Sequence, residues 1–133
     1  MEKKQVIVYV DWDDNYCACV EGLACVATGQ TPAEVKQRIR EALAWHLEAM
    51  REDGEEIPAK LQGDYRLLYQ LTAQALLKSS QSMVTQAALS RATGINRQQL
   101  SHYSTGIRRP RPAQRKRIVL GLHQLGHELL AVE

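Results

Sequence analysis

Apolar and polar positions alternate with a period of two over the first part of the chain, which predicts β-strands. Residues 6–10 (Val-Ile-Val-Tyr-Val) form one such run and end at the polar group 11–15, and residues 16–20 form a second. Residues 24–27 form a short third run, which Gly29 ends. We therefore expect three strands, with the first two joined as a hairpin whose loop holds Asp11, Asp13 and Asp14.

The period then becomes helical. Thr31-Pro32-Ala33-Glu34 has the form of a capping box with proline at the first helical position, in which Glu34 reaches back to the Thr31 N–H. The predicted helix ends before Gly54 and places a set of largely apolar residues on one face: Val35, Ile39, Ala42, Leu43, His46, Leu47 and Met50. Residues 65–71 predict a fourth strand. The order β-β-β-α-β predicts a small sheet, mostly antiparallel, with one helix packed on it.

After Leu71 only helical patterns follow. Thr72 is a candidate N-cap for a helix over residues 73–78, Thr85 and Asn96 cap the next two, and a last helix begins near Pro112. The sequence thus predicts an α+β chain of two domains, residues 1–71 and an all-helical domain over residues 72–133. The stripe Ile118, Leu122, Leu125 and Leu129 on the last helix predicts a contact between two copies, or else closes the core of its own domain.

Residues 85–106 have the spacing of a helix-turn-helix. Leu89 and the small Ser90 suit a steep helix crossing, Gly94 stands where the first helix must stop, and Asn96 can cap the second. Leu100 and Tyr103 turn inward together, and Gly106 ends the second helix. The alternative is an ordinary helical hairpin with a basic face.

This arrangement points four polar side chains of the second helix outward: Arg97, Gln98, Ser101 and His102. Arginine and glutamine read guanine and adenine edges, and a recognition helix contacts bases through its N-terminal residues. Six basic residues follow and are expected at phosphates: Arg108, Arg109, Arg111, Arg115, Lys116 and Arg117.

The charge distribution supports two modules with different partners. Residues 1–64 carry seven Lys/Arg against thirteen Asp/Glu, a net charge of −6, whereas residues 65–133 carry ten against two, a net of +8. No acid occurs between Asp64 and Glu128. A basic half suits a phosphate backbone, although a merely solvated basic surface is the alternative.

The second half resembles the Cro and phage-repressor class of helix-turn-helix over residues 72–131. The resemblance rests on Thr85-Gln86, Leu89, Gly94, Asn96, Leu100, Gly106 and Pro110, with Ser90 in place of the more usual alanine. It implies that Gln86 touches a phosphate at the start of the first helix. The DNA-binding residues predicted in this way are Gln86, Asn96, Arg97, Gln98, Ser101, His102, Arg108, Arg109 and Arg111.

The first half resembles the HicB antitoxins. The matching segments are Gly29-Gln30-Thr31-Pro32-Ala33-Glu34, Glu41-Ala42-Leu43 and Arg51-Glu52-Asp53-Gly54-Glu55-Glu56-Ile57-Pro58. The chain departs from the family between strands two and three, where a glycine- and proline-rich segment is shortened to Glu21-Gly22-Leu23. The resemblance implies a partial RNase H-like fold that masks a small RNA-cleaving toxin similar to HicA. Five acids are our candidate toxin contacts because of their charge, with Trp45 as an apolar anchor beside them: Asp11, Asp13, Asp14, Glu52 and Asp53.

Other residues invite an enzymatic interpretation. Asp11, Asp13 and Asp14 are interpreted as a solvated turn rather than nuclease metal ligands, and His46 as a packed side chain rather than a general base. Cys17, Cys19 and Cys25 lack the spacing of a metal site, so we expect three buried thiols in strands. Trp45 lies off the apolar stripe, either as an anchor for a partner or as a cap on the sheet edge.

Taken together, these patterns predict a cytoplasmic antitoxin and autorepressor, a homodimer or larger homo-oligomer that binds operator DNA and a HicA-like toxin. We expect no enzymatic activity, no cofactor, no metal and no membrane partner. The alternative is a stand-alone transcriptional regulator whose first domain binds a small ligand or oligomerises.

Overall fold

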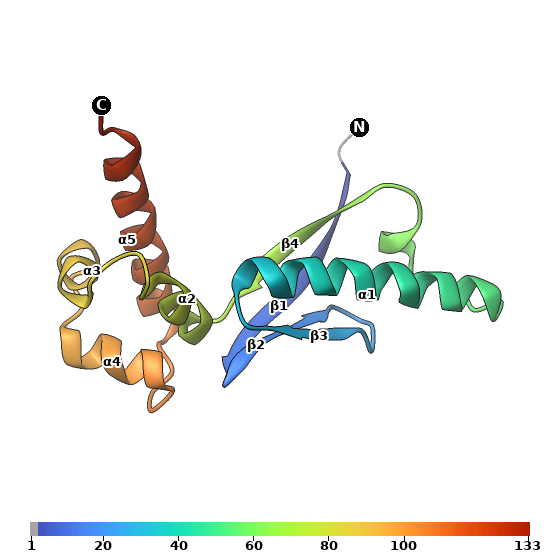
Figure 1. The fold of residues 1–133 in the computed structure, drawn as a ribbon, viewed down its shortest axis with the longest axis horizontal. Helices are drawn as coiled ribbons and strands as arrows, with labels where there is room; N and C mark the ends of the chain where they lie inside the picture. The colour runs from blue at the N-terminus through green and yellow to red at the C-terminus, as the bar shows by residue number, and fades with distance from the viewer. Residues whose placement is uncertain (1–2) are drawn as a thin grey trace. The chain divides into compact units, whose positions relative to one another are not determined.

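The computed structural model describes residues 3–133, and the α+β class predicted from the sequence is confirmed. The chain divides between Thr72 and Ala73 into two compact units, which we call unit 1 and unit 2. Unit 1 holds the sheet and one long helix, and unit 2 is entirely helical (Figure 1).

Unit 1 is built on a mixed four-stranded sheet. Its strands are β1 (Lys4–Asp13), β2 (Asn15–Val20), β3 (Val26–Gly29) and β4 (Tyr65–Leu71), in the spatial order β3-β2-β1-β4. The pairs β1–β2 and β2–β3 are antiparallel, as expected for strands that follow one another closely. The pair β1–β4 is parallel, because α1 (Pro32–Glu52) carries the chain back before β4 begins.

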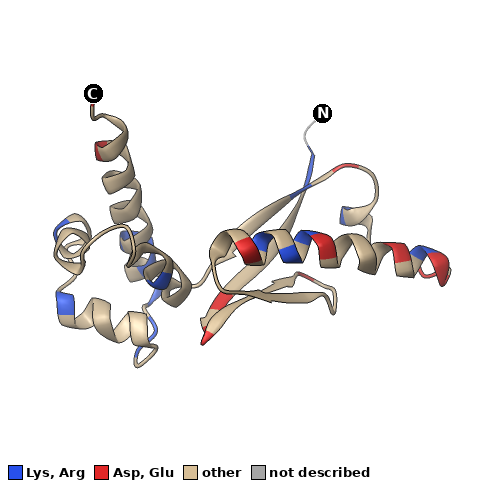
Figure 2. Ribbon diagram, viewed as in Figure 1, with Lys and Arg blue, Asp and Glu red and all other residues tan. Residues whose placement is uncertain are grey.

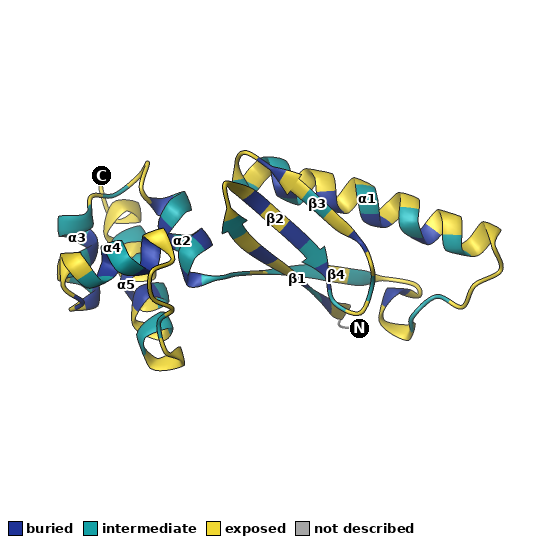
Figure 3. Ribbon diagram, turned by 90° about the horizontal axis from the view of Figure 1, so that it is seen from below, coloured by how far each residue is buried: buried dark blue, intermediate teal, exposed yellow. Residues whose placement is uncertain are grey.

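Helix α1 packs on one face of this sheet through its predicted apolar stripe. Four of its residues are buried, and so are alternate residues of β1 and β2, as Figure 3 shows by colour: Val35, Ile39, Leu43, Leu47, Val6, Val8, Val10, Ala18 and Val20. The helix begins as predicted, because the Thr31 hydroxyl oxygen accepts a hydrogen bond of 3.1 Å from the Glu34 N–H. The Glu34 carboxylate, which we expected to reach back to Thr31, instead lies 2.9 Å from Arg38 Nη2.

The hairpin between β1 and β2 is tighter than predicted. β1 continues to Asp13, so that Asp11 faces Cys17 and Asp13 faces Asn15 across the two strands. Asp14 alone forms the bend, with a positive φ of 62°. The predicted five-residue polar loop is therefore wrong, because antiparallel pairing continues through side chains that are solvated on the open face of the sheet.

The third strand and the cysteines also differ from expectation. β3 begins two residues later than predicted, because the Cys25 carbonyl accepts from the Val20 N–H and closes the turn before it. Cys17 is exposed and Cys19 half-buried on β2, whereas Cys25 is buried just before β3, so the expectation of three buried thiols in strands is wrong. Burial raises the pKa of the Cys25 thiol, which favours its neutral form.

A short 3₁₀ turn, η1 (Ala59–Leu61), joins α1 to β4 and buries Leu61. The Lys4 ammonium donates to the carbonyl oxygens of Ala59 and Gln62, at 2.8 and 3.2 Å. The Lys60 ammonium lies 3.1 Å from a carboxylate oxygen of Glu21, and this hydrogen bond is the largest cause that lowers the pKa of Glu21. These contacts hold the segment around η1, which connects α1 to β4, in place.

Unit 2 contains α2 (Ala73–Ser80), α3 (Gln86–Thr93), α4 (Arg97–Thr105) and α5 (Pro112–Leu130). Its core is made of residues from all four helices and the α3–α4 turn: Ala73, Leu77, Leu89, Ile95, Leu100, Tyr103 and Ile118. Leu122 and Leu125 of the α5 stripe pack partly against this core, whereas Leu129 is 67% exposed. Within residues 3–133 no helix has the length and apolarity needed to cross a membrane.

Candidate nucleic-acid and protein interfaces

The turn between α3 and α4 is short and fixed at both ends. Gly94 follows α3 with a left-handed φ of 73°, and its N–H donates to the Ser90 carbonyl at 2.8 Å. Asn96 precedes α4, and its side-chain oxygen accepts from the Gln99 N–H at 2.8 Å. Gly94 therefore ends α3 and Asn96 caps α4, as the sequence predicted, and the DNA contact of Asn96 stays a prediction.

Hydrogen bonds from side chains to the backbone hold this turn further. The Ser90 hydroxyl donates to the Ile95 carbonyl at 2.6 Å, so the residue that replaces the usual alanine also ties α3 to the turn. The Thr93 hydroxyl donates to the Leu89 carbonyl at 2.8 Å and accepts from the Ile95 N–H at 3.1 Å. The position of α4 relative to α3 is thus set by several short bonds as well as by packing.

Helix α4 has one buried and one solvent-facing side. Leu100, Tyr103 and Ser104 are buried, and Gln99 donates to the Tyr103 hydroxyl oxygen at 2.7 Å. Of the predicted base-reading residues, Arg97 and Gln98 are exposed, and Ser101 and His102 are half-buried. The exposed pair lies in the first turn of α4, where a recognition helix makes its base contacts.

Positive charge lies beside this helix. Arg108, Arg109 and Arg111 are all exposed in the segment between α4 and α5. Figure 2 shows basic positions along unit 2, with acidic colour confined to the far end of α5. A segment of this kind, next to a helix whose first turn is open, suits contacts to phosphates.

Arg117 has a different environment from the one we predicted for it. Its Nε donates to the Thr93 carbonyl at 3.1 Å, and its Nη1 donates to the Gln114 side chain at 2.9 Å. Arg117 therefore caps the C-terminal end of α3 and ties it to α5, and its expected phosphate contact stays a prediction. The sequence could not distinguish the two roles, because a basic residue after a basic segment is equally compatible with a phosphate contact and with a helix cap.

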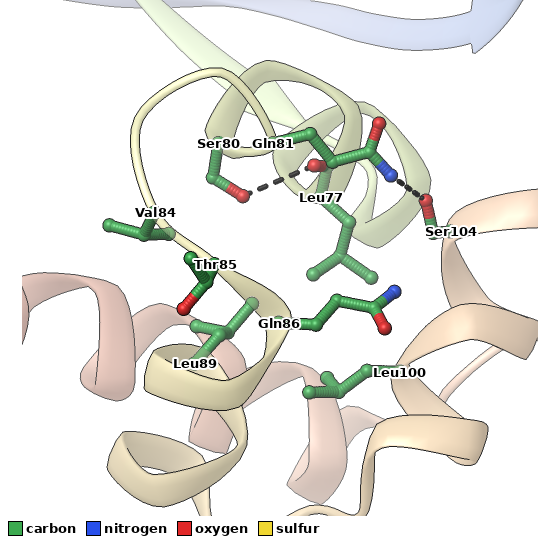
Figure 4. Close-up of a pocket in the computed structure, with 9 residues that line it drawn as sticks. All are labelled: Leu77, Ser80, Gln81, Val84, Thr85, Gln86, Leu89, Leu100 and Ser104. Carbon is green, nitrogen blue, oxygen red and sulfur yellow. Dashed lines mark hydrogen bonds between the residues drawn. The ribbon is translucent and has the colours of Figure 1, made fainter.

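Gln86 lies beside a hollow between α2, α3 and α4 (Figure 4). The hollow has a volume of about 20 Å³, which is enough for about one water molecule and too small for a metabolite. On its rim, Gln81 donates to the Ser104 hydroxyl at 2.7 Å and so ties α2 to α4. Gln86 is half-buried and reaches across the hollow, and its phosphate contact stays a prediction.

The structure separates the six candidate toxin contacts into two groups. Asp11, Asp13 and Asp14 lie at the tip of the β1–β2 hairpin, and Trp45, Glu52 and Asp53 lie toward the C-terminal end of α1 (Figure 2). At about 1.5 Å per residue the 21-residue α1 is about 31 Å long, and the two groups lie at opposite ends of unit 1. A single small partner would engage one group more readily than both.

Trp45 is the residue of the second group that the fold explains least. Its side chain is 74% exposed, so the alternative in which it caps the sheet edge is wrong. Glu41 and Glu48, one turn away on either side, are exposed as well. An exposed indole framed by carboxylates is suited to contact a partner that carries both apolar and basic groups.

Among the described residues, no group of three or more His, Cys, Asp or Glu side chains could hold a metal ion. His46 is half-buried on α1. A scan against protein-family models and a search of curated proteins found no match to this chain.

Proposed function

We propose that unit 2 binds double-stranded DNA with α4 in the major groove and represses transcription from that site. The observation that carries this proposal is the first turn of α4, where Arg97 and Gln98 are exposed on a helix that short hydrogen bonds hold against α3. Exposed Arg108, Arg109 and Arg111 supply the charge needed at the flanking phosphates.

The far end of α5 would join two copies on the DNA. Leu129, Leu130 and Val132 are 67%, 84% and 73% exposed, more apolar surface than a helix end needs. A two-fold dimer would place two α4 helices at half-sites roughly 34 Å apart, one turn of B-DNA. The operator we propose is accordingly palindromic.

The DNA-binding proposal predicts different effects at two arginines. Arg97→Ala should relax discrimination at one base pair by about 1–3 kcal/mol, roughly 5- to 150-fold, because arginine reads a guanine edge. Arg109→Ala should weaken binding to all sequences alike, because a phosphate contact carries no sequence information. Selection of binding sites from a random DNA library, performed with both variants, measures the difference.

The two variants control for each other, since each removes one exposed guanidinium from unit 2. Equal loss of specificity in both, or relaxed specificity in Arg109→Ala alone, would show that α4 is not the recognition helix.

We further propose that the chain is a HicB-type antitoxin, in which unit 1 masks a small basic RNA-cleaving toxin. The resemblance over residues 29–58 and the acidic charge of residues 1–64 support this. A protein that grips RNA displays Lys and Arg, and an acidic surface can cover them. The exposed Trp45 makes the C-terminal end of α1 the better contact of the two acidic groups.

This choice of surface can be tested with the full chain and the product of the gene beside its own, which the proposal expects to be a small basic protein. Trp45→Ala should weaken the complex by about 2 kcal/mol, roughly 30-fold, because exposed indoles that become buried dominate binding energy. Glu52→Lys with Asp53→Lys should slow association about tenfold or more. Kinetic binding measurements and protection of RNA from cleavage report both effects.

The matched control reverses Asp11 and Asp13 at the opposite end of unit 1, and it should leave both readouts unchanged. If only this control weakens the complex, the hairpin tip is the contact. If the wild-type chain neither binds the neighbouring product nor protects RNA, the antitoxin proposal fails and DNA binding stands alone.

A further inference from the structure

β4 is an unusually apolar strand for the edge of a sheet. It pairs with β1 on one side, and within residues 3–133 no strand pairs with it on the other. Five of its seven residues are Tyr or Leu, and none of them is fully buried. Natural edge strands are protected by shortness, proline, bulges or charged side chains such as lysine. β3, the other edge, has only four residues, whereas β4 has seven residues, no proline and a single charged residue, Arg66.

The backbone groups that β4 directs away from β1 follow from its pairing with β1. The Thr72 N–H donates to the Val10 carbonyl and thus points toward β1. Because each residue of a strand directs its N–H and C=O to the same side and neighbours alternate, Leu68 and Gln70 also bond toward β1. Leu67 and Tyr69 therefore direct their backbone N–H and C=O groups to the open side.

A groove runs along this open side between β4 and α1. It has a volume of about 400 Å³ and is lined by Arg40, Leu43, Tyr65, Leu67 and Tyr69. Arg40 donates to the Tyr69 hydroxyl oxygen at 3.3 Å, and the Lys36 ammonium lies 5.0 Å from the centre of the Tyr69 ring. Tyr69 is thus held in place beside an edge that offers hydrogen bonds.

We propose that a second copy of the chain occupies this edge, with its β4 antiparallel to the first and the two-fold axis at Leu68. This register makes Leu67 face Tyr69 of the second copy, and these are the residues whose backbone groups point outward. Leu68 faces its own equivalent as a non-hydrogen-bonded pair, the type in which opposed side chains lie closest. Tyr65, Leu67 and Tyr69 of both copies then line the two grooves as one apolar layer.

Charge in this register favours the same partner. Arg66 is the one charged residue of β4, and it faces the neutral amide of Gln70 in the second copy rather than another cation. Such a self-complementary register pairs outward backbone groups, apolar side chains and a donor with an acceptor at once. The proposal concerns unit 1 alone and does not rest on DNA binding, on a toxin or on the end of α5.

The two-fold axis at Leu68 gives a charge-swap test. In the full chain, Leu68→Lys alone and Leu68→Glu alone each oppose like charges across the axis, so each should halve the mass measured in solution. An equimolar mixture of the two variants should restore the wild-type mass, because lysine then faces glutamate. Native mass spectrometry of the mixture should show mixed pairs in preference to either self-pair.

The matched control is Val26→Lys, which adds the same charge to the open sheet face on the opposite edge, where Val26 is 64% exposed. It should leave the mass unchanged. Circular dichroism should show all variants folded, and recovery in the mixture excludes unfolding as the cause. If Leu68→Lys keeps the wild-type mass, or the mixture does not recover it, the proposal is wrong. If the wild-type chain is monomeric in solution, the proposal of pairing through β4 is also wrong, whatever the affinity of the chain for DNA.

Leu129→Glu separates this proposal from the dimer proposed at α5. When Leu68→Lys is added to a chain that carries Leu129→Glu, the mass of the assembly in solution should still fall by half. If Leu129→Glu alone yields a monomer, α5 holds the copies together and the β4 proposal fails.

Discussion

Raising the salt concentration from about 50 to about 200 mM will weaken DNA binding by about a thousandfold. Arg108, Arg109 and Arg111 give three candidate phosphate contacts per chain, and a two-fold dimer gives six. Each neutralised phosphate releases condensed counterions and adds about 0.9 to the slope of log affinity against log salt. Replacing all three arginines with glutamine in each chain should therefore lower that slope by about 5.

The control for this experiment removes the same charge from unit 1, at Lys3, Arg38 and Arg51, which are also exposed. It should leave the slope almost unchanged, because those residues belong to unit 1 and not to the helical unit that we propose binds DNA. Affinity measured by fluorescence anisotropy at several salt concentrations gives the slopes. An equal change in both triple variants would show that net charge, and not the α4–α5 segment, drives binding.

Gly121→Ala and Gly126→Ala will change stability in opposite directions, although both lie in α5. A Cβ at residue 121 would lie 2.5 Å from the Thr93 methyl carbon and 3.3 Å from the Thr93 nitrogen, whereas one at residue 126 would meet no atom within 4 Å. Gly126→Ala should stabilise unit 2 by about 1 kcal/mol through helix propensity. Gly121→Ala should destabilise it by about 1–3 kcal/mol through overpacking.

The same contact predicts a specific rescue. Thr93→Ser removes the methyl carbon that blocks residue 121 but keeps the hydroxyl that donates to Leu89. The double variant Gly121→Ala with Thr93→Ser should therefore be more stable than Gly121→Ala alone. Thermal unfolding of the wild-type chain, of both glycine variants and of the double variant measures these differences. The unfolding temperature of a unit of this size should change by about 4–8 °C per kcal/mol. If the double variant is no more stable, α3 and α5 are not packed as described.

The helix starts and the α3–α4 turn could be predicted from the sequence because their causes are local. Thr31, Thr85 and Asn96 each accept the hydrogen bond expected of an N-cap, and each bond spans three residues. Gly94 adopts the left-handed conformation that its position demanded. Caps and turns depend on a few consecutive residues, so a single sequence carries the necessary information.

Contacts between distant parts of the chain could not be predicted in this way. Arg117 bonds to a carbonyl 24 residues earlier, and its local sequence gives equal reason to place it on a phosphate. The extended β1–β2 hairpin and the later start of β3 depend on cross-strand register, which polarity alone does not specify. The base-reading and toxin-binding residues stay predictions, because their roles depend on partners.

The parallel pair of β1 and β4 has a consequence for synthesis on the ribosome. β1 pairs with a strand that begins 61 residues later, at Tyr65 opposite Lys4, so the sheet stays incomplete until residue 71 has left the exit tunnel. Until then the emerging chain exposes the unpaired side of β1, the kind of surface on which chaperones act and aggregates start. Unit 2 has no strand that waits for a distant partner, and local helical contacts form quickly. A pause in translation would therefore do most harm if it comes before residue 71 has left the exit tunnel, a point reached only after the ribosome has moved past the codon for Leu71, and little if it comes later.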